Sequence, residues 1–426
     1  MVKSGLINRN PEFDKFLLDK IAAAKHVKGA YRTTGMVTIP VVFHFILNST
    51  QLHTIGDSAG IANRVLTQID VLNEDYNRGN ADSSVIPAAF KQYYGNVNIR
   101  FGLAHTDPGN NATNGWEIVT TNKTGFDVTT IDNIGNYIAG RDAKHAVTGG
   151  SDAWDINSYI NIWVVNMLDG SLPANYIGLT VPPSFTDSSS FNTNPYPKDE
   201  MGLLLRYDAV GRRTSAGEYF YPGIDLGRTC THEMGHFFGL FHPWGDDGNL
   251  CPWNGGKDDG IADTPPECDA NYHCPNFPKY DCCTTDSPGI MFMDYMDYSD
   301  DACLNMFTLD QITLMDANVS TAGESHSLTS HPQLLNYPGT PPATDNKYFV
   351  LNPAVNARSS VNFNQLPDGF ESITVYNSMG QKVKFIVTSG QQTTFFPIDM
   401  DGFGKGVYIL KIQFNTHTDI TKIIIP

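Results

Sequence analysis

The sequence predicts a mixed α/β (α+β) domain followed by a separate all-β module. Before residue 231, apolar strand patterns alternate with an amphipathic helix pattern, which is typical of a mixed α/β domain. Residues 321–346 are rich in Ser, Thr, Pro and Gly and predict a linker. Residues 347–426 then contain short apolar segments separated by turn residues, which is typical of a small β-sandwich.

Composition and charge exclude some classes of function. The chain has 426 residues, of which 41% are hydrophobic, and this is enough for two or three domains. The formal net charge of −17 argues against nucleic acid as a partner, because phosphate contacts need basic patches. No run of about 18 apolar residues is present, so we expect no membrane span.

The first half of the chain supplies strand and helix patterns in order. Residues 1–35 are polar and partly helical, and we expect them to be the remnant of a pro-region. A catalytic domain is predicted at 36–320, and it begins with the core strand Val37–Leu47. We expect His44 on this strand to be a packed strand histidine rather than a ligand. Apolar residues on one face predict a helix at 62–77.

The later patterns of this domain are less regular. Strands are predicted at 98–104 and 159–166, and the second is apolar enough to lie inside a sheet. The stretch 178–206 is rich in loops, and within it we expect 201–206 to supply an edge strand that lines a cleft. From there to a helix pattern at 306–315, regular structure is sparse apart from one motif.

That motif is Thr231–His242, which has the spacing H-E-x-x-H-x-x-G-x-x-H. On a helix, residues four apart lie on one face, so His232 and His236 can present their imidazoles together. Gly239 is expected to end the helix, because glycine enters left-handed conformations without a Cβ penalty. The chain can then turn back and deliver His242 as a third ligand. Three neutral imidazoles leave the fourth position of a tetrahedral zinc open, as in a catalytic site.

Glu233 lies beside the predicted ligands and is the candidate general base. Zinc lowers the pKa of a water to near 7 and polarises a substrate carbonyl. Glu233 would accept the proton of this water and pass it to the leaving amine. Scattered histidines on an apolar helix are one alternative, and a structural zinc site is another. The first requires a chance match to the whole pattern, and the second would more often use a fourth Cys or His.

The cysteines indicate the compartment. Six of the seven fall in one window: Cys251, Cys268, Cys274, Cys282, Cys283 and Cys303. No paired C-x-x-C spacing supports a second metal site, so disulfides formed in an oxidising compartment fit better. Cys230, next to the motif, is expected to be a buried thiol. The first residues lack the apolar core of a signal peptide, so we expect an export signal to be missing from this sequence.

A second segment, Tyr295–Tyr298, carries a methionine after the histidine motif. Together the two resemble the metzincin metalloendopeptidases with their Met-turn. Over residues 37–321 the chain resembles the pappalysin family and its bacterial members. Supporting stretches include Gln68–Asp75, Ala262-Asp-Thr-Pro-Pro and Tyr298–Cys303. The resemblance implies one catalytic zinc, held by His232, His236 and His242, with Glu233 as general base and acid.

The resemblance also implies roles for the second segment. Met296 would be the Met-turn methionine, packed beneath the metal rather than bound to it. Met293 lies in the near-duplicate Phe292-Met-Asp-Tyr295 and is the competitor for this role. Tyr298 would stabilise the oxyanion of the tetrahedral intermediate. Asp301 matches an acid of the primed-side specificity pocket, so a preference for Arg or Lys after the scissile bond is expected. A solvated loop carboxylate is the alternative reading of Asp301.

A calcium site and disulfide pairs are implied in the same way. Asp259, the Ala262 carbonyl and Thr264 would hold a structural calcium, since calcium prefers carboxylate, hydroxyl and carbonyl oxygens. A solvated acidic turn is the alternative. The resemblance pairs Cys251 with Cys282 and Cys274 with Cys303. Cys268 and Cys283 depart from the family pattern, and we expect a third bridge between these two.

The final module resembles the C-terminal sorting domain of type IX secretion. Its marks include Val375–Val383 and the terminal Lys422-Ile-Ile-Ile. The sequence therefore predicts a zinc endopeptidase that acts on proteins or peptides outside the cell or at its surface, with the secretion machinery as a partner. One rival is a non-catalytic surface adhesin that kept a zinc fold, although such relatives usually lose the glutamate. A hydrolase of non-peptide substrates is disfavoured, because Tyr298 and the Met-turn accompany the motif.

Overall fold

The computed structural model describes residues 11–26, 36–129, 140–186, 196–246, 250–336, 348–350, 358–363, 369–387, 395–415 and 418–425. It divides into two compact units. One contains Met1–Ser58 and Thr67–Gly339, and the other contains Ala59–Leu66 and Thr340–Pro426. Large parts of the predicted pro-region and linker lie outside the described residues.

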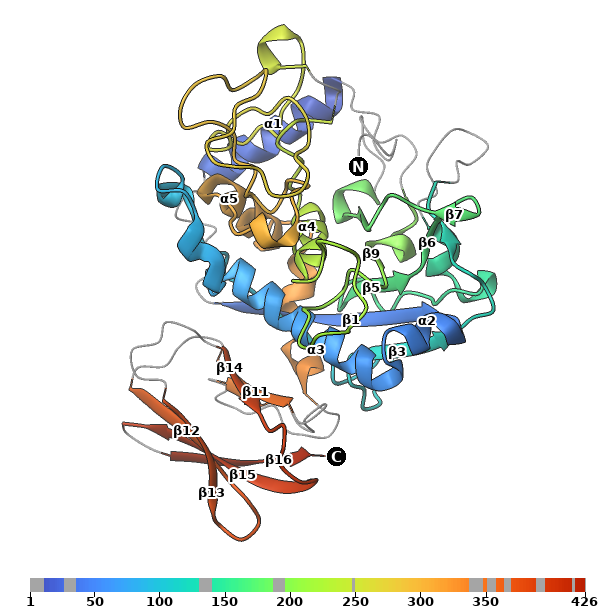
Figure 1. The fold of residues 1–426 in the computed structure, drawn as a ribbon, viewed down its shortest axis with the longest axis vertical. Helices are drawn as coiled ribbons and strands as arrows, with labels where there is room; N and C mark the ends of the chain where they lie inside the picture. The colour runs from blue at the N-terminus through green and yellow to red at the C-terminus, as the bar shows by residue number, and fades with distance from the viewer. Residues whose placement is uncertain are drawn as a thin grey trace. The chain divides into compact units, whose positions relative to one another are not determined.

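A mixed six-stranded sheet lies at the centre of the first unit (Figure 1). The strand order is β2–β1–β5–β9–β8, and β3 also pairs with β1. All pairs are parallel except β8 with β9. The bounds are β1 Val37–Leu47, β2 Ile99–Leu103, β3 Trp116–Thr120, β5 Ile160–Val165, β8 Gly178–Val181 and β9 Gly202–Arg206. β5 is buried along its whole length, which explains its continuous apolar run.

The prediction that residues 201–206 form an edge strand is wrong. β9 lies between β5 and β8, and its first four residues are buried. Its run Gly-Leu-Leu-Leu is the continuous apolar pattern of an interior strand rather than the alternation of an edge. The edge is β8, a strand of four residues inside the loop-rich stretch. β8 also lies against the helix that carries the histidine motif.

The helices of this unit are labelled in Figure 1. They are α1 Pro11–His26, α2 Ser49–Thr54, α3 Asp57–Tyr76, α4 Arg228–Phe237 and α5 Leu309–Val319. α3 starts five residues earlier than predicted, because Gly56 takes a left-handed conformation (φ 89°) and turns the chain directly from α2 into α3. A capping box begins α5, in which Thr308 accepts from Gln311. No helix among the described residues has the length and apolar character needed to cross a bilayer.

Apart from the main sheet and these helices, the elements described in the first unit are small. β4 Phe126–Asp127, β6 Met167–Asp169 and β7 Leu172–Pro173 make a separate three-stranded sheet. Between α4 and α5 the named elements of the described chain are two single turns of 3-10 helix, Pro252–Asn254 and Asp301–Cys303. This agrees with the sparse regular structure expected after residue 242. The region is instead cross-linked by disulfides.

Two of the three predicted disulfide pairs are wrong. Cys274–Cys303 is present as predicted, but the bridges predicted as Cys251–Cys282 and Cys268–Cys283 are exchanged. The structure joins Cys251 to Cys283 and Cys268 to Cys282. The sulfur of Cys282 also lies 3.7 Å from that of Cys251. Because Cys282 and Cys283 are consecutive, backbone direction decides the pairing and sequence spacing cannot. Cys230 is a buried free thiol, as predicted.

Apart from Ala59–Leu66, which belong to α3, the described residues of the second unit are all-β, as the sequence predicts for 347–426. One antiparallel sheet contains β10 Tyr348–Val350, β11 Arg358–Phe363 and β14 Phe395–Asp399. The other, also antiparallel, contains β12 Phe370–Tyr376, β13 Lys382–Val387, β15 Gly406–Phe414 and β16 Thr418–Ile425. Apolar side chains from both sheets form one buried cluster, which includes Val361, Ile398, Ile373 and Leu410. This is the construction of a β-sandwich.

Candidate metal centre

α4 places the histidine motif in the interior of the first unit. All ten residues of the helix are buried. Gly227 caps its start with φ 83°, and the helix ends at Phe237. Gly239 then takes φ 95°, in the left-handed region that favours glycine, and turns the chain back. This confirms the expected role of Gly239 and brings His242 alongside the helix.

The three histidines converge on one point. The Nε2 atoms of His232 and His236 lie 3.0 Å apart, those of His236 and His242 3.1 Å, and those of His232 and His242 3.2 Å. Two nitrogen ligands of a tetrahedral zinc with bonds of about 2.0–2.1 Å are separated by about 3.3 Å. Burial lowers the pKa of His232 to about 3, and the nearby His242 lowers it further. Burial also lowers the pKa of His236 well below its usual value. The imidazoles of His232 and His236 are therefore neutral, which is the form that binds metal, and the set of three histidines fits zinc.

Each ring is oriented through its other nitrogen. Nδ1 of His232 lies 2.8 Å from the Tyr295 carbonyl, and Nδ1 of His236 lies 2.8 Å from the Leu240 carbonyl. A carbonyl can only accept, so both Nδ1 atoms donate. Nδ1 of His242 meets both carboxylate oxygens of Asp246 at 2.8 Å. All three Nε2 lone pairs are thus directed at the same place.

Asp246 and Trp244 were not predicted from the sequence. The Trp244 indole donates to Asp246 Oδ1 at 3.0 Å, and its ring stacks on His242 with centroids 4.3 Å apart. Trp244 therefore fixes both the third ligand and the carboxylate that orients it. A usable signal existed, since metal-binding histidines commonly donate to a carboxylate and Asp246 lies four residues after His242.

Glu233 is buried and held by the edge strand β8. Thr180 Oγ1 donates to Glu233 Oε2 at 2.6 Å and to the Glu233 carbonyl at 2.9 Å. Gly178 leaves the space for this carboxylate, because a Cβ there would lie 2.5 Å from Oε1. Burial raises the pKa of Glu233 to about 7, although the Thr180 hydrogen bond acts in the opposite direction. Neither Thr180 nor Gly178 carries a sequence signal for this role.

Met296 lies directly beneath α4. A Cβ at Gly235 would be 2.5 Å from the Met296 sulfur. The absence of a side chain at Gly235 therefore lets Met296 pack directly against the helix. Met293, the competitor for the Met-turn role, packs in a separate cluster with Phe90 and Met306. The geometry thus favours Met296 over Met293.

Tyr298 stands beside the histidines. Its ring centroid lies 4.8 Å from that of His242 and 5.5 Å from that of His232. The residue is 39% exposed, and burial of the phenol raises the pKa of Tyr298. The preceding Asp297 is buried and accepts from the Tyr298 amide at 2.7 Å and from the Asn271 amide at 2.9 Å. These bonds fix the backbone that presents the phenol.

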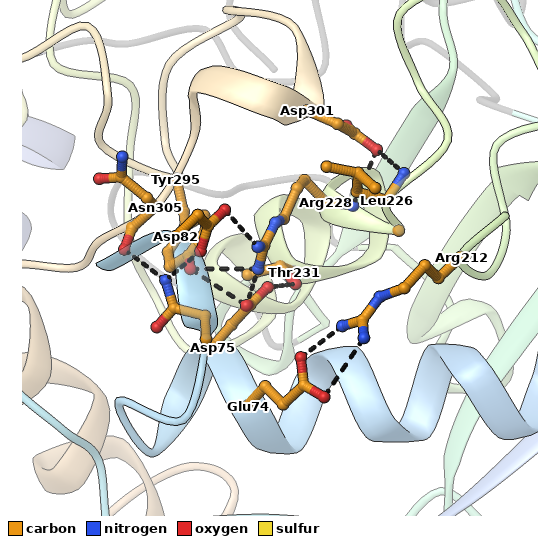
Figure 2. A network of polar contacts seen from close by, with 12 residues as sticks. Glu74, Asp75, Asp82, Arg212, Leu226, Arg228, Thr231, Tyr295, Asp301 and Asn305 are labelled. Carbon is orange, nitrogen blue, oxygen red and sulfur yellow. Dashed lines mark hydrogen bonds and ion pairs between the residues drawn. The ribbon is translucent and has the colours of Figure 1, made fainter. Parts of the chain in front are cut away.

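Asp301 is a buried residue rather than a solvated loop carboxylate. It is 1% exposed, and its Oδ2 accepts from the backbone amides of Leu226 at 2.7 Å and Arg228 at 3.3 Å (Figure 2). Burial raises the pKa of Asp301 to about 6, and these two hydrogen bonds oppose the rise. Asp301 therefore lies at the start of α4, one turn from the first histidine.

Two of the three predicted calcium ligands, Asp259 and Thr264, lie in contact. Asp259 and Thr264 are buried, whereas Ala262 is exposed. The Thr264 hydroxyl lies 2.9 Å and 3.0 Å from the two Asp259 carboxylate oxygens. His44, in contrast, is fully buried in β1 and contacts Glu117 and Asn161, as expected of a packed strand histidine.

Comparison with known proteins decides the family. A peptidase family described as pregnancy-associated plasma protein-A matches residues 144–320. Mature mirolysin of Tannerella forsythia, solved with a cleaved peptide, is 36% identical with a TM-score of 0.59. This match covers 71% of the present chain and 99% of mirolysin. The chain belongs to the pappalysin family.

Further relatives agree with a pappalysin peptidase. A promirolysin variant of Tannerella forsythia is 33% identical with a TM-score of 0.61, covering 77% of this chain and 95% of that one. An extracellular metalloprotease of Podospora anserina is 25% identical, over 70% of this chain and 81% of the relative. The protein is thus a metalloendopeptidase, and its three histidines fit the zinc that the family implies.

The second unit matches a different family. A secretion system C-terminal sorting domain matches residues 352–426. This confirms the resemblance of the all-β module to a type IX sorting domain. Together with the extracellular fungal relatives, it indicates a secreted or cell-surface protein.

Proposed function

We propose that this pappalysin is a zinc endopeptidase that cleaves proteins or peptides outside the cell, before arginine or lysine residues. The observation that carries the proposal is the convergence of three histidine Nε2 atoms within 3.0–3.2 Å beside a buried carboxylate. His232, His236 and His242 would hold the metal. An open fourth position is the arrangement of catalytic rather than structural zinc.

A zinc ion at this place supplies Lewis acidity, which polarises a carbonyl oxygen and lowers the pKa of a water to near 7. Glu233 accepts the proton of the attacking water and delivers it to the leaving amine. Thr180 keeps the carboxylate in position for both transfers, through its 2.6 Å hydrogen bond. Tyr298 donates its phenolic proton in a hydrogen bond to the oxyanion that develops on the substrate carbonyl.

Asp301 is proposed to select a basic residue just after the scissile bond. The backbone amides of Leu226 and Arg228 both donate to Oδ2 of this carboxylate, which leaves Oδ1 for the guanidinium or ammonium of a substrate. A carboxylate with 1% exposure gives a desolvated and therefore stronger ion pair. Its pKa of about 6 means that it is ionised at neutral pH.

A structural calcium at Asp259, the Ala262 carbonyl and Thr264 is proposed as well. The Asp259–Thr264 contact already gathers carboxylate and hydroxyl oxygens, the ligands that calcium prefers. We expect added calcium to raise the melting temperature of the wild type and not that of Asp259→Asn. If calcium raised the melting temperature of both proteins equally, Asp259 would not be a calcium ligand.

The type IX machinery is the proposed export partner of residues 352–426, the part that matches the sorting domain. Deleting this segment is expected to leave the peptidase inside the producing cell. Release of the truncated chain at wild-type levels would contradict the proposal.

The peptidase function is tested with Glu233→Gln and a casein substrate. We expect the variant to lose about 10³-fold or more in activity, because a poor leaving group needs the proton shuttle, while it still binds one zinc. Wild-type activity should disappear with a zinc chelator and return with zinc. Near-normal hydrolysis by Glu233→Gln would contradict the mechanism, and a zinc-loaded wild type without activity would favour the adhesin.

A further inference from the structure

Arg228 is a buried cation at the first residue of α4 (Figure 2). Its Nη2 donates to Asp82 Oδ2 at 2.8 Å. Its Nη1 donates to the Tyr295 hydroxyl at 3.2 Å and is paired with Asp75 Oδ1. The N-terminus of a helix favours negative rather than positive charge. The stability of α4 alone therefore does not account for an arginine here.

Asp75 joins three segments of the chain. It lies in α3 and is 1% exposed. Oδ1 accepts from the Tyr295 hydroxyl at 3.0 Å as well as from Arg228, and Oδ2 accepts from Thr231 Oγ1 at 2.6 Å. Both oxygens of this buried carboxylate are thus used. Through them α3 is tied to the start of α4 and to the segment just before the Met-turn.

Tyr295 connects this network to the metal centre. Its hydroxyl is held by Asp75 and Arg228, and its own carbonyl accepts from Nδ1 of His232 at 2.8 Å. Its amide donates to the Met306 carbonyl at 2.9 Å, and the side chain is fully buried. A residue fixed at hydroxyl, amide and carbonyl has little freedom to rotate. The direction of its carbonyl is therefore set by the contacts of its ring.

The three zinc-binding histidines differ in what orients them. His236 donates to Leu240 and His242 to Asp246, each four residues further along the chain. The partner of His232 is Tyr295, 63 residues away. Contacts within a few residues along the chain, including the stacking of Trp244 on His242, fix the rings of His236 and His242. The orientation of His232 depends instead on how a separate segment is held against α4.

We propose that Asp75 is a positioning residue of the metal centre: with Arg228 it anchors the Tyr295 hydroxyl and so holds the Tyr295 carbonyl where it orients His232. The inference rests on the zinc site proposed above. The alternative is a buried ion pair that acts on the fold alone. In that case removing it would destabilise the metal-free and zinc-loaded proteins equally, with no change in metal affinity.

The experiment uses the full chain with the variants Asp75→Asn and Tyr295→Phe. The zinc dissociation constant is measured by competition with a chelator, and the visible absorption of the cobalt-substituted protein reports ligand geometry. We expect the zinc dissociation constant to rise about tenfold or more, as for other residues that orient a metal ligand. The cobalt spectrum should change, and kcat should fall while KM stays within about twofold.

Asp82→Asn is the matched control. It removes a carboxylate from the same guanidinium, but no hydrogen bond to Tyr295 involves Asp82 among the described residues. We expect its zinc dissociation constant and cobalt spectrum to match those of the wild type. Equal losses in Asp82→Asn would make the network a matter of stability and overturn the inference.

Tyr295→Phe keeps the ring and the carbonyl, so it decides the matter even if Asp75→Asn does not fold. Unchanged zinc affinity and an unchanged cobalt spectrum in Tyr295→Phe would overturn the positioning role and leave the peptidase proposal intact. His232→Ala separates the two questions. If it bound zinc as tightly as the wild type, the metal centre itself would be wrong, and the inference with it.

Discussion

The two sides of the metal centre are built by different means. On the helix side, His232 and His236 are one turn apart in α4, so the backbone hydrogen bonds of the helix place them. On the loop side, His242, Asp246 and Tyr298 lie in a region whose named elements are single 3-10 turns in the described chain. On the loop side, hydrogen bonds from the backbone to buried side chains fix the chain, whereas on the helix side the backbone hydrogen bonds of α4 do so.

Buried carboxylates take over the role of regular backbone pairing on the loop side. Asp294 accepts from the Met296 amide at 2.8 Å, and Glu267 accepts from the Met291 amide at 3.2 Å. Burial raises the pKa of Asp294 to about 7 and raises the pKa of Glu267 well above its usual value, so their ionised forms are present at an electrostatic cost. The comparison teaches that a catalytic centre can combine one side placed by the regular backbone of a helix with another placed by hydrogen bonds to buried side chains.

Among variants that leave the histidines and Glu233 unchanged, the largest effect is expected on the helix side, from Gly178→Ala. The new Cβ would lie 2.5 Å from Glu233 Oε1, so the carboxylate must move. A displacement of about 1 Å costs roughly 10²-fold in rate, so we expect kcat/KM to fall by about that factor. Zinc content should not change, because no histidine is displaced. Gly404→Ala is the control, since a Cβ there has nothing within 4 Å. Full activity in Gly178→Ala would show that Glu233 has more freedom than the geometry allows.

On the loop side, Asp246→Asn tests whether the carboxylate orients and polarises His242. The amide retains the shape but not the charge, so we expect zinc affinity to fall about 10- to 100-fold. Chelator competition measures this directly. Asp286→Asn, an exposed acid of the same loop region, should bind zinc as the wild type does. If the two variants behaved alike, His242 would be held by Trp244 stacking alone.

A smaller effect, about tenfold, is expected for substrate selection by Asp301. Its pKa of about 6 lies above the usual 3.8, so the negative charge is present at pH 8 and lost as the pH falls through 6. The preference for arginine over a neutral residue after the scissile bond should therefore weaken from pH 8 to pH 5. Peptide pairs that differ only at this position provide the measurement. Asp301→Ala should show a low and pH-independent preference, and an unaltered cleavage profile would exclude Asp301 as the selector.

The same division explains what could be predicted from the sequence. The ligands His232, His236 and His242 follow from periodicity and from a glycine that turns the chain, both of which are local properties. Thr180 could not be found, because it reaches Glu233 only through the pairing of β8 in the sheet. Strand β8 was itself missed, since four residues within a loop-rich stretch give too short a pattern.

The disulfides mark the limit of reasoning from resemblance. Cys274–Cys303 was predicted correctly, because each of these cysteines has no neighbouring competitor. Cys282 and Cys283 are interchangeable by spacing, and only the path of the backbone distinguishes them. Asp301 was identified from its place after the Met-turn, but its contact with the first residues of α4 required coordinates.

The close contact of Met296 with Gly235 has a consequence for oxidative damage. Met296 is fully buried, and its sulfur fills the space where a helix side chain would stand. A sulfoxide oxygen has no room there while the protein is folded. Met379, by contrast, is 76% exposed. An oxidant should therefore modify Met379 early and reach Met296 only in molecules that have opened, so that sulfoxide at Met296 becomes a chemical record of unfolding at the metal centre.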